Sequence, residues 1–173
     1  MDNSVLLITK RKRENMSKIL IRGKEGSGKT WLVRDIINDI LEEEKINILA
    51  YTDMHEGEVE EFGDMFEGKV SLLITLGEDK KEVILDTFLS EQKKDNHSLE
   101  VAIFDECGYF EGEQREKLIK LLENADKHNQ TVILTYQHEE KKPMHDIEKY
   151  CDTFIELDKY SKYSHEYTVT TVD

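Results

Sequence analysis

The sequence predicts an α/β fold: one three-layer domain over residues 1–173, with a mostly parallel central sheet, helices on both of its faces and a C-terminal β-hairpin. Short apolar runs rich in branched residues alternate along the chain with segments whose apolar residues recur at helical spacing, which is typical of such a sheet. The 173 residues contain no internal repeat and no linker rich in proline or glycine. A single domain follows from these observations.

The first half of the chain is expected to hold four strands and three helices. The expected strands are Val5–Thr9, Lys18–Arg22, Ile46–Tyr51 and Val70–Leu76. The expected helices are Lys29–Glu44, Glu58–Phe66 and Asp79–Gln92. In the third helix, four apolar residues are expected to face the core: Val83, Ile84, Phe88 and Leu89.

The second half is expected to hold four strands and two helices, with polar loops between them. The expected strands are Val101–Phe104, Thr131–Thr135, Thr153–Leu157 and Tyr167–Val172, and the last two form the closing hairpin. The expected helices are Glu113–His128 and a short one from Pro143 to about Tyr150. The polar segment Glu91–Ser98 is expected to be a solvated loop, and the polar segment Asp158–Glu166 separates the two strands of the hairpin.

The charge of the chain limits its partners. Its 24 basic and 38 acidic residues give a net charge of -14, which argues against a nucleic-acid or membrane binder that uses its whole surface. A local basic loop such as Lys10–Arg13 is still able to contact a polyanion. No apolar stretch approaches the roughly 20 residues that cross a bilayer, so we expect no membrane insertion and a cytoplasmic location.

A glycine-rich loop joins the expected strand Lys18–Arg22 to the helix after it. Its residues match the pattern G-x-x-x-x-G-K-[ST] at every fixed position: Gly23, Lys24, Glu25, Gly26, Ser27, Gly28, Lys29 and Thr30. The glycines let backbone N–H groups approach phosphate oxygens, and the helix N-terminus adds partial positive charge there. Lys29 is expected to reach the β- and γ-phosphates, and Thr30 to offer its hydroxyl to Mg²⁺. The loop predicts a site for ATP with Mg²⁺; no guanine-reading N-K-x-D sequence is present.

A second half of the site is expected where the apolar run Val101–Phe104 ends in Asp105 and Glu106. A strand buried on both faces delivers such acids to the carboxyl edge of the sheet, where ligands of open α/β sheets bind. We expect Asp105 to hold Mg²⁺, mostly through water. We expect Glu106 to orient the attacking water or accept its proton, so that Glu106 and Lys29 carry the catalysis.

With the loop Gly23–Thr30 and the segment Phe104–Glu106 in place, the chain resembles the P-loop NTPases. The adjacent acids make it similar to the division with an extra strand and a catalytic glutamate, which includes RecA-like and AAA-type ATPases. The resemblance implies a nucleotide seated across the strand tips and an ATPase that depends on Mg²⁺.

Three later segments resemble the FtsK/HerA group of DNA-pumping motors and conjugative coupling ATPases: Val101–Glu106, the helix ending Leu121–Ala125, and the strand Thr131–Gln137. The resemblance implies a polar sensor for the γ-phosphate at the end of the last of these. Gln137 is the best match and is taken as a third catalytic residue, with Thr135 second. It also implies a role in DNA transfer or segregation, with DNA or a DNA-processing complex as partner and a homo-oligomer as the assembly.

Other features depart from that group. The chain is short for a DNA-pumping motor, and its acidic balance does not suit a pore lined by phosphate contacts. A ring ATPase also needs an arginine that reaches its neighbour. Arg115 and Arg34 are the candidates, although an ordinary solvated or helix-paired arginine is the favoured interpretation of each.

Two alternative functions use the same residues. The segment Asp105–Phe110 is similar to the acid pair and aromatics of small bacterial thymidine kinases, which implies a nucleoside or small-molecule kinase whose glutamate deprotonates a hydroxyl. The four-cysteine zinc lobe of those enzymes is absent, because Cys107 and Cys151 are the only cysteines. The other alternative is a non-catalytic ATP-dependent switch or assembly protein, with the acidic segments Glu42–Glu44 and Glu56–Glu61 as its contact surface.

Overall fold

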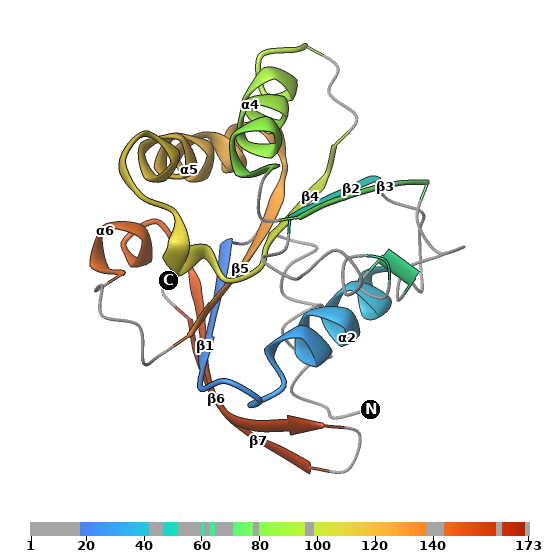
Figure 1. Ribbon diagram of the computed structural model, residues 1–173, viewed down its shortest axis with the longest axis vertical. Coiled ribbons are helices and arrows are strands. Elements are labelled where there is room, and N and C mark those ends of the chain that lie inside the picture. The colour runs from blue at the N-terminus through green and yellow to red at the C-terminus, as the bar shows by residue number, and fades with distance from the viewer. Residues whose placement is uncertain are drawn as a thin grey trace.

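The computed structural model describes residues 18–41, 47–51, 60, 63–64, 71–77, 80–95, 99–137, 144–161 and 164–171. The expected strand Val5–Thr9, the basic loop Lys10–Arg13 and most of the expected helix Glu58–Phe66 lie outside these residues. Figure 1 shows the described elements as a central sheet with helices on both of its sides.

The described part of the chain contains one seven-stranded sheet with the order β3-β2-β4-β5-β1-β6-β7. Its strands are β1 (Lys18–Gly23), β2 (Asn47–Tyr51), β3 (Leu72–Leu76), β4 (Val101–Phe104), β5 (Thr131–Gln137), β6 (Thr153–Ser161) and β7 (Ser164–Thr171). Neighbouring strands are parallel throughout, except that β6 and β7 pair antiparallel as the closing hairpin. The mostly parallel sheet and the C-terminal hairpin predicted from the sequence are confirmed.

Four α-helices cover this sheet in the described chain: α2 (Lys29–Leu41), α4 (Lys81–Glu91), α5 (Gly112–Ala125) and α6 (His145–Glu148). Two short 3-10 turns, η2 (Cys107–Tyr109) and η3 (Asp126–His128), flank α5. In Figure 1, α2 lies on one side of the sheet, and α4, α5 and α6 lie on the other. The three layers predicted from the sequence are therefore present.

The core divides into two clusters, one on each face of the sheet, because successive side chains of a strand point to opposite faces. Along β1, Ile19 and Ile21 pack with the apolar residues of α2, whereas Leu20 packs with those of α4 and α5. All four residues of β4 are buried, as expected for a central strand of a parallel sheet. The apolar residues that α2 contributes are Leu32, Val33, Ile36 and Ile37.

Two expectations about facing residues and segment ends are wrong. Val83 is 55% exposed, because α4 begins at Lys81 and turns Ile84, Leu85 and Phe88 toward the core instead. The expected helix Asp79–Gln92 and the expected loop Glu91–Ser98 overlap at Gln92, and only the helix fits it: Gln92 is buried at the end of α4. Its side-chain amide donates to the backbone oxygen of Leu121 and to Gln130 Oε1, so the solvated loop begins later than expected.

The polar segment Asp158–Glu166, expected to separate the two strands of the hairpin, consists mostly of strand. β6 continues to Ser161 and β7 starts at Ser164, with a register shift between Leu157 and Lys159. Exposed polar residues are able to extend these strands because the hairpin lies at the margin of the sheet, where the strands have no apolar layer to match. Among the described residues, no helix is both long enough and apolar enough to cross a membrane.

Candidate nucleotide-binding site

The loop between β1 and α2 is a tight turn at the carboxyl edge of the sheet. The Ser27 amide donates to the Lys24 oxygen at 3.1 Å, and the Leu32 amide donates to the Gly28 oxygen at 3.0 Å. Gly26 and Gly28 have φ of 71° and 94°, a left-handed region that L side chains rarely adopt. The sequence therefore folds here as the glycine pattern predicts, into a loop that ends in the first turn of a helix.

Gly23 is held in a space that admits no side chain. A Cβ atom built there would lie 2.4 Å from Ser27 Oγ and 2.7 Å from the backbone oxygen of Leu157 on β6. Close approach of β6 to the start of the loop is therefore the reason for glycine at this position. The Ser27 side chain can turn aside, but the Leu157 oxygen belongs to the backbone of β6 and cannot easily yield.

The residues of the loop fit a bound phosphate. Ser27 Oγ is buried and has no hydrogen-bond partner among the described atoms, and a buried polar atom of this kind calls for a ligand or a water. The helix start at Lys29 and the glycines at 26 and 28 supply the N–H groups and open space that an anion needs. A triphosphate therefore suits this loop on the evidence of its own atoms.

Lys29 is 7% exposed and folds its amine back over the loop. Its Nζ lies 3.3 Å from the backbone oxygens of Gly23 and Lys24, and 3.2 Å from Glu106 Oε1. A buried ammonium is tolerated only where such partners compensate for lost water. The side chain is thus already positioned within the loop, and it ties α2 to the acid after β4.

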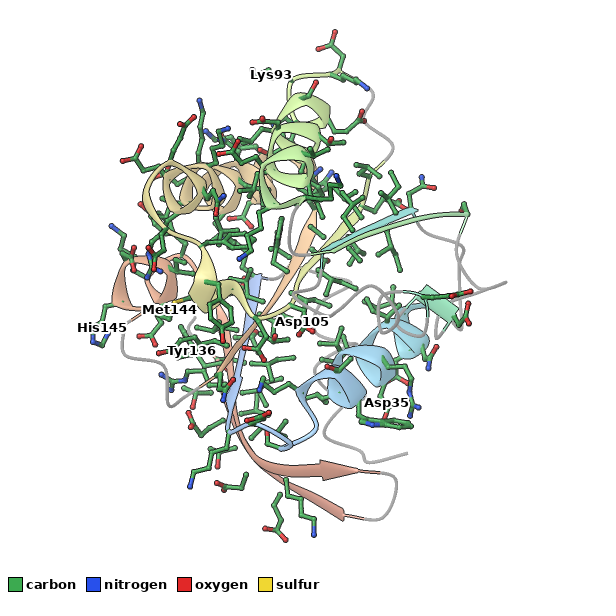
Figure 2. All side chains as sticks on the ribbon, viewed as in Figure 1. Asp35, Lys93, Asp105, Tyr136, Met144 and His145 are labelled. Carbon is green, nitrogen blue, oxygen red and sulfur yellow. The ribbon has the colours of Figure 1, made fainter. Side chains whose placement is uncertain are left out.

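Asp105 and Glu106 leave β4 at the same edge of the sheet. Asp105 is 4% exposed and lies between the strand ends and α2 (Figure 2). Strand β5 separates β1 from β4, so that the extra strand implied by the resemblance is present. The contact between Lys29 and Glu106 spans this strand and brings the two predicted halves of the site together.

Thr135 on β5 lies behind the acid pair. Its hydroxyl donates to Asp105 Oδ1 at 2.5 Å and accepts from the Glu106 amide at 2.8 Å. It is fully buried, so it has no access to a nucleotide from this position. Gln137, the other sensor candidate, is the last residue of β5, is half-buried, and is the strand partner of Gly23. The structure places Gln137 at the start of the loop and Thr135 beneath the acids.

Magnesium is the metal that these residues fit. In the part of the chain that is described, no group of three or more His, Cys, Asp or Glu side chains forms a metal cage. Mg²⁺ is commonly held by one or two protein oxygens together with phosphates and water. The hydroxyl of Thr30, half-buried in the first turn of α2, and the carboxylate of Asp105 are oxygens of the kind that such a site uses.

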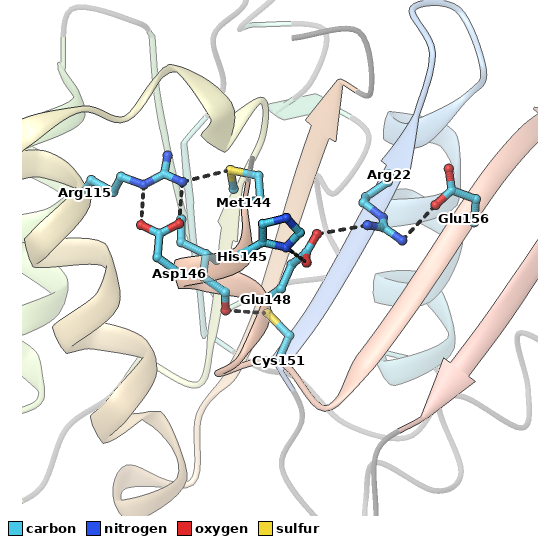
Figure 3. A network of polar contacts seen from close by, with 9 residues as sticks. Arg22, Arg115, Met144, His145, Asp146, Glu148, Cys151 and Glu156 are labelled. Atoms are coloured by element: carbon cyan, nitrogen blue, oxygen red, sulfur yellow. Dashed lines mark hydrogen bonds and ion pairs between the residues drawn. The ribbon is translucent and has the colours of Figure 1, made fainter. Parts of the chain in front are cut away.

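Arg115 and Arg34, the candidates for an arginine that reaches the site of a neighbouring subunit, form ion pairs within their own chain. Arg115 Nε and Nη2 each lie 2.6 Å from a carboxylate oxygen of Asp146 on α6, and Figure 3 shows this bidentate ion pair. The hydrogen bond raises the pKa of Arg115 and lowers that of Asp146. Arg34 pairs with Asp35 and lies 3.9 Å above the ring of Trp31. Both arginines are thus ordinary ion-paired residues of their own chain, although neither pair has the spacing of three or four residues expected of partners within one helix.

A further set of ion pairs links β1, the strand before the glycine loop, to α6 and β6. Arg22, the residue before the glycine loop, contacts Glu148 at 2.9 Å and Glu156 at 3.0 Å, as drawn in Figure 3. Glu148 also contacts His145 at 3.1 Å. Glu148 and Glu156 are more than 120 residues from Arg22 in the sequence, so no local sequence pattern predicts these ion pairs.

Both cysteines are buried, as predicted. Burial raises the pKa of the Cys107 thiol well above its usual range and raises the pKa of Cys151 to about 12. Thiols with such pKa values are poor nucleophiles at neutral pH. Neither cysteine therefore adds chemistry to the site. Asp53 and His55, which follow the expected strand Ile46–Tyr51 in the sequence, and His138, which follows Gln137, lie outside the described part of the chain.

Solved structures with this fold include ATPase domains of two larger proteins. The chain matches EssC (ATPases 2 and 3) from Geobacillus thermodenitrificans with a TM-score of 0.66 and 10% identity, over 90% of this chain and 37% of that one. It matches the cytoplasmic domain of the type VII secretion ATPase EccC from Thermomonospora curvata with a TM-score of 0.59 and 14% identity, over 85% and 21%. At such identities the likeness shows the fold alone, and the chain spans well under half the length of either structure.

Sequence comparisons give a family. No curated protein sequence matches the chain. The sequence model described as zonular occludens toxin (Zot) matches residues 17–164, which include the glycine loop, the acid pair and β5.

Proposed function

This chain belongs to the Zot family, and from that membership and the geometry of the loop we propose that it is an ATPase that depends on Mg²⁺. The observation that carries the proposal is the distance of 3.2 Å between Lys29 Nζ and Glu106 Oε1. It brings together the two charged groups that a P-loop ATPase uses, one for the phosphates and one for the attacking water.

The loop Gly23–Thr30 binds the phosphates of ATP in this proposal. Backbone amides at the start of α2 and the amine of Lys29 face the phosphate oxygens, and the buried hydroxyl of Ser27 gains the partner that it lacks among the described atoms. Thr30 and Asp105 hold Mg²⁺ there. The metal ion, when bound, neutralises charge that develops on the phosphate oxygens during transfer.

Glu106 is the general base that activates the attacking water in this proposal. Its carboxylate accepts a proton from water as the water oxygen bonds to the γ-phosphorus, and the bond from that phosphorus to the oxygen of ADP breaks. The products are ADP and inorganic phosphate. Lys29 must turn from Glu106 to the phosphates before this step, so the arrival of ATP releases the carboxylate from its ion pair. Gln137 is the group proposed to sense the γ-phosphate beside Gly23.

The work driven by hydrolysis is proposed to be the movement of a polymer. DNA transfer or segregation, in a homo-oligomer, is the role implied by the resemblance to FtsK/HerA proteins. The name of EccC as a type VII secretion ATPase adds protein export as a second cargo class. The net charge of -14 weakens the case for DNA, because binding to phosphates requires basic side chains.

ATP turnover measured alone, with DNA and with nucleosides tests the proposal. We expect release of phosphate with Mg²⁺ and ATP alone, at a rate that DNA raises if DNA is the cargo. Replacing Lys29 by Ala should abolish tight binding of ATP, and Glu106→Gln should lower turnover by about 10²–10⁴-fold. Phosphate transfer to a nucleoside, with little ATP consumed in its absence, would establish the kinase instead. Binding of ATP with neither turnover nor transfer would establish the switch.

A further inference from the structure

Glu106 has a backbone conformation that its residue type disfavours. Its φ and ψ are 53° and 49°, in the left-handed region. Among the described residues, Asn129 is the only other non-glycine residue with positive φ, and asparagine tolerates this region far better than glutamate does. Strain of this kind persists only where the surrounding structure holds it, and it is concentrated at functional sites.

The hydroxyl of Thr135 supplies one such restraint. It accepts a hydrogen bond from the Glu106 amide at 2.8 Å and donates one to Asp105 Oδ1 at 2.5 Å, so it links the backbone of one acid to the side chain of the other. The pairing of Phe104 with Leu134 in the parallel register puts Thr135 level with Asp105. A second restraint continues the turn, because the Glu106 oxygen accepts from the Tyr109 amide at 3.3 Å.

The direction in which a side chain leaves the backbone depends on φ and ψ. In a strand that stayed extended, the glutamate after Asp105 would point to the opposite face of the sheet from Asp105. In the left-handed conformation the chain turns sharply after Asp105, and the Glu106 carboxylate reaches Lys29 across β5. The hydrogen bond from the Glu106 amide to the Thr135 hydroxyl is therefore placed to determine whether the Glu106 carboxylate faces the glycine loop.

We infer that Thr135 is a positioning residue for ATP hydrolysis, acting through the backbone of Glu106 and the carboxylate of Asp105 without contact to the nucleotide. This inference rests on the proposed ATPase function. It differs from a sensor role, in which a side chain at the end of β5 touches the γ-phosphate, because Thr135 is fully buried. Its loss should therefore slow the chemical step and leave the binding of ATP largely intact.

The test compares two substitutions at this position. Thr135→Val keeps the shape of the side chain and removes the hydroxyl, whereas Thr135→Ser keeps the hydroxyl. Thr131→Val is the matched control, because it makes the same change at the opposite end of β5, away from the acids. Each protein is assayed for kcat, for affinity toward a non-hydrolysable ATP analogue, and for hydrogen exchange of the Glu106 amide.

For Thr135→Val we expect kcat to fall by roughly 30-fold to 100-fold, the loss typical of a misplaced catalytic group. The affinity for the analogue should change by less than about threefold, and exchange at Glu106 should speed up by about tenfold, as the loss of one hydrogen bond predicts. Thr135→Ser should restore most of kcat and of the protection. If Val at this position prevents folding, Thr135→Ala is compared with Thr135→Ser by the same measurements.

Three results would overturn the inference: unchanged kcat in Thr135→Val, a loss of affinity as large as the loss of kcat, or unchanged exchange at Glu106. Failure of the proposed function looks different. In that case the wild type releases no phosphate, while the exchange measurement still reports whether Thr135 holds the Glu106 amide.

Discussion

Replacing Glu106 by Gln should make the protein bind ATP more tightly as well as stopping its turnover. The Glu106 carboxylate lies 3.2 Å from Lys29 Nζ. Binding of ATP requires this amine to turn toward the phosphates, so the ion pair must break first. A neutral glutamine removes that competition and also removes a negative charge facing the γ-phosphate.

The size of the effect follows from the geometry. Two unit charges 3.2 Å apart interact by roughly 5 kcal/mol at an effective dielectric constant of 20. Most of this is offset by desolvation, and a hydrogen bond between charged groups contributes about 1.5–3 kcal/mol net. We take the lower end because the Glu106 side chain is 21% exposed and solvent screens the pair. About 1.5 kcal/mol corresponds to roughly tenfold tighter binding.

The assay is an equilibrium titration with a non-hydrolysable ATP analogue and Mg²⁺. Trp31, the single tryptophan, directly follows Thr30 and is 45% exposed, so its fluorescence is a suitable signal. Glu116→Gln, which removes the same charge from an exposed position on α5, is the control and should stay within about twofold of the wild type. Equal or weaker binding by Glu106→Gln would refute the competition between the carboxylate and the phosphates for Lys29.

Three further predictions concern the loop, α6 and the thiols. Gly23→Ala should lower the free energy of unfolding in urea by about 1–3 kcal/mol, because its Cβ would lie 2.7 Å from a backbone oxygen of β6. Gly26→Ala, whose Cβ would have nothing within 4 Å, should lower it by only about 1 kcal/mol, which comes from the positive φ. Equal losses in the two variants would contradict this reasoning. Asp146→Asn should cost about 0.5–1 kcal/mol at pH 7, since the carboxylate is 43% exposed and screened. Because Arg115 lowers the pKa of Asp146, this difference is fully present above the unfolded value of about 4 and is lost as the pH falls through the lowered folded value; a difference independent of pH would rule out the charge as its source. Both buried cysteines should resist a thiol reagent at pH 8 until the protein is unfolded, and rapid labelling of the native protein would show that burial does not protect them.

Local patterns in the sequence predict much of this fold. The glycine loop has fixed spacing, and the strands β1, β4 and β5 read as apolar runs because both faces of a central parallel strand are buried. The alternation of strands and helices then predicts a parallel sheet and three layers. The hairpin is likewise predicted, although the polar residues of β6 and β7 give no sign of how far its strands extend.

The arrangement within the site depends on contacts that sequence patterns do not record. The ion pair of Lys29 with Glu106 joins residues that only the strand order brings close. The left-handed Glu106 is unexpected because its residue type disfavours that conformation. The threonine that follows the apolar run Val132–Leu134 was the available signal for Thr135, but it could not distinguish a group facing the nucleotide from one buried behind the acids.

The arginine contacts show the same limit in another form. Arg115 has a helical neighbourhood that favours an ordinary paired arginine, which is confirmed, but its partner Asp146 lies 31 residues away on α6. Such a pairing depends on how α5 and α6 pack on one face of the sheet. Sequence spacing predicts partners within a helix, at three or four residues, and it predicts none between helices.

The nucleotide site is tested by calorimetric titration of ATP with Mg²⁺ into the wild type and into Lys29→Ala. We expect saturable binding of one ATP per chain by the wild type, and a loss of affinity of at least about 100-fold in the variant, because the buried amine is the principal charge facing the phosphates. No saturable binding by a folded wild type, or equal affinity in the two proteins, would contradict the assignment of Gly23–Thr30 as the nucleotide site.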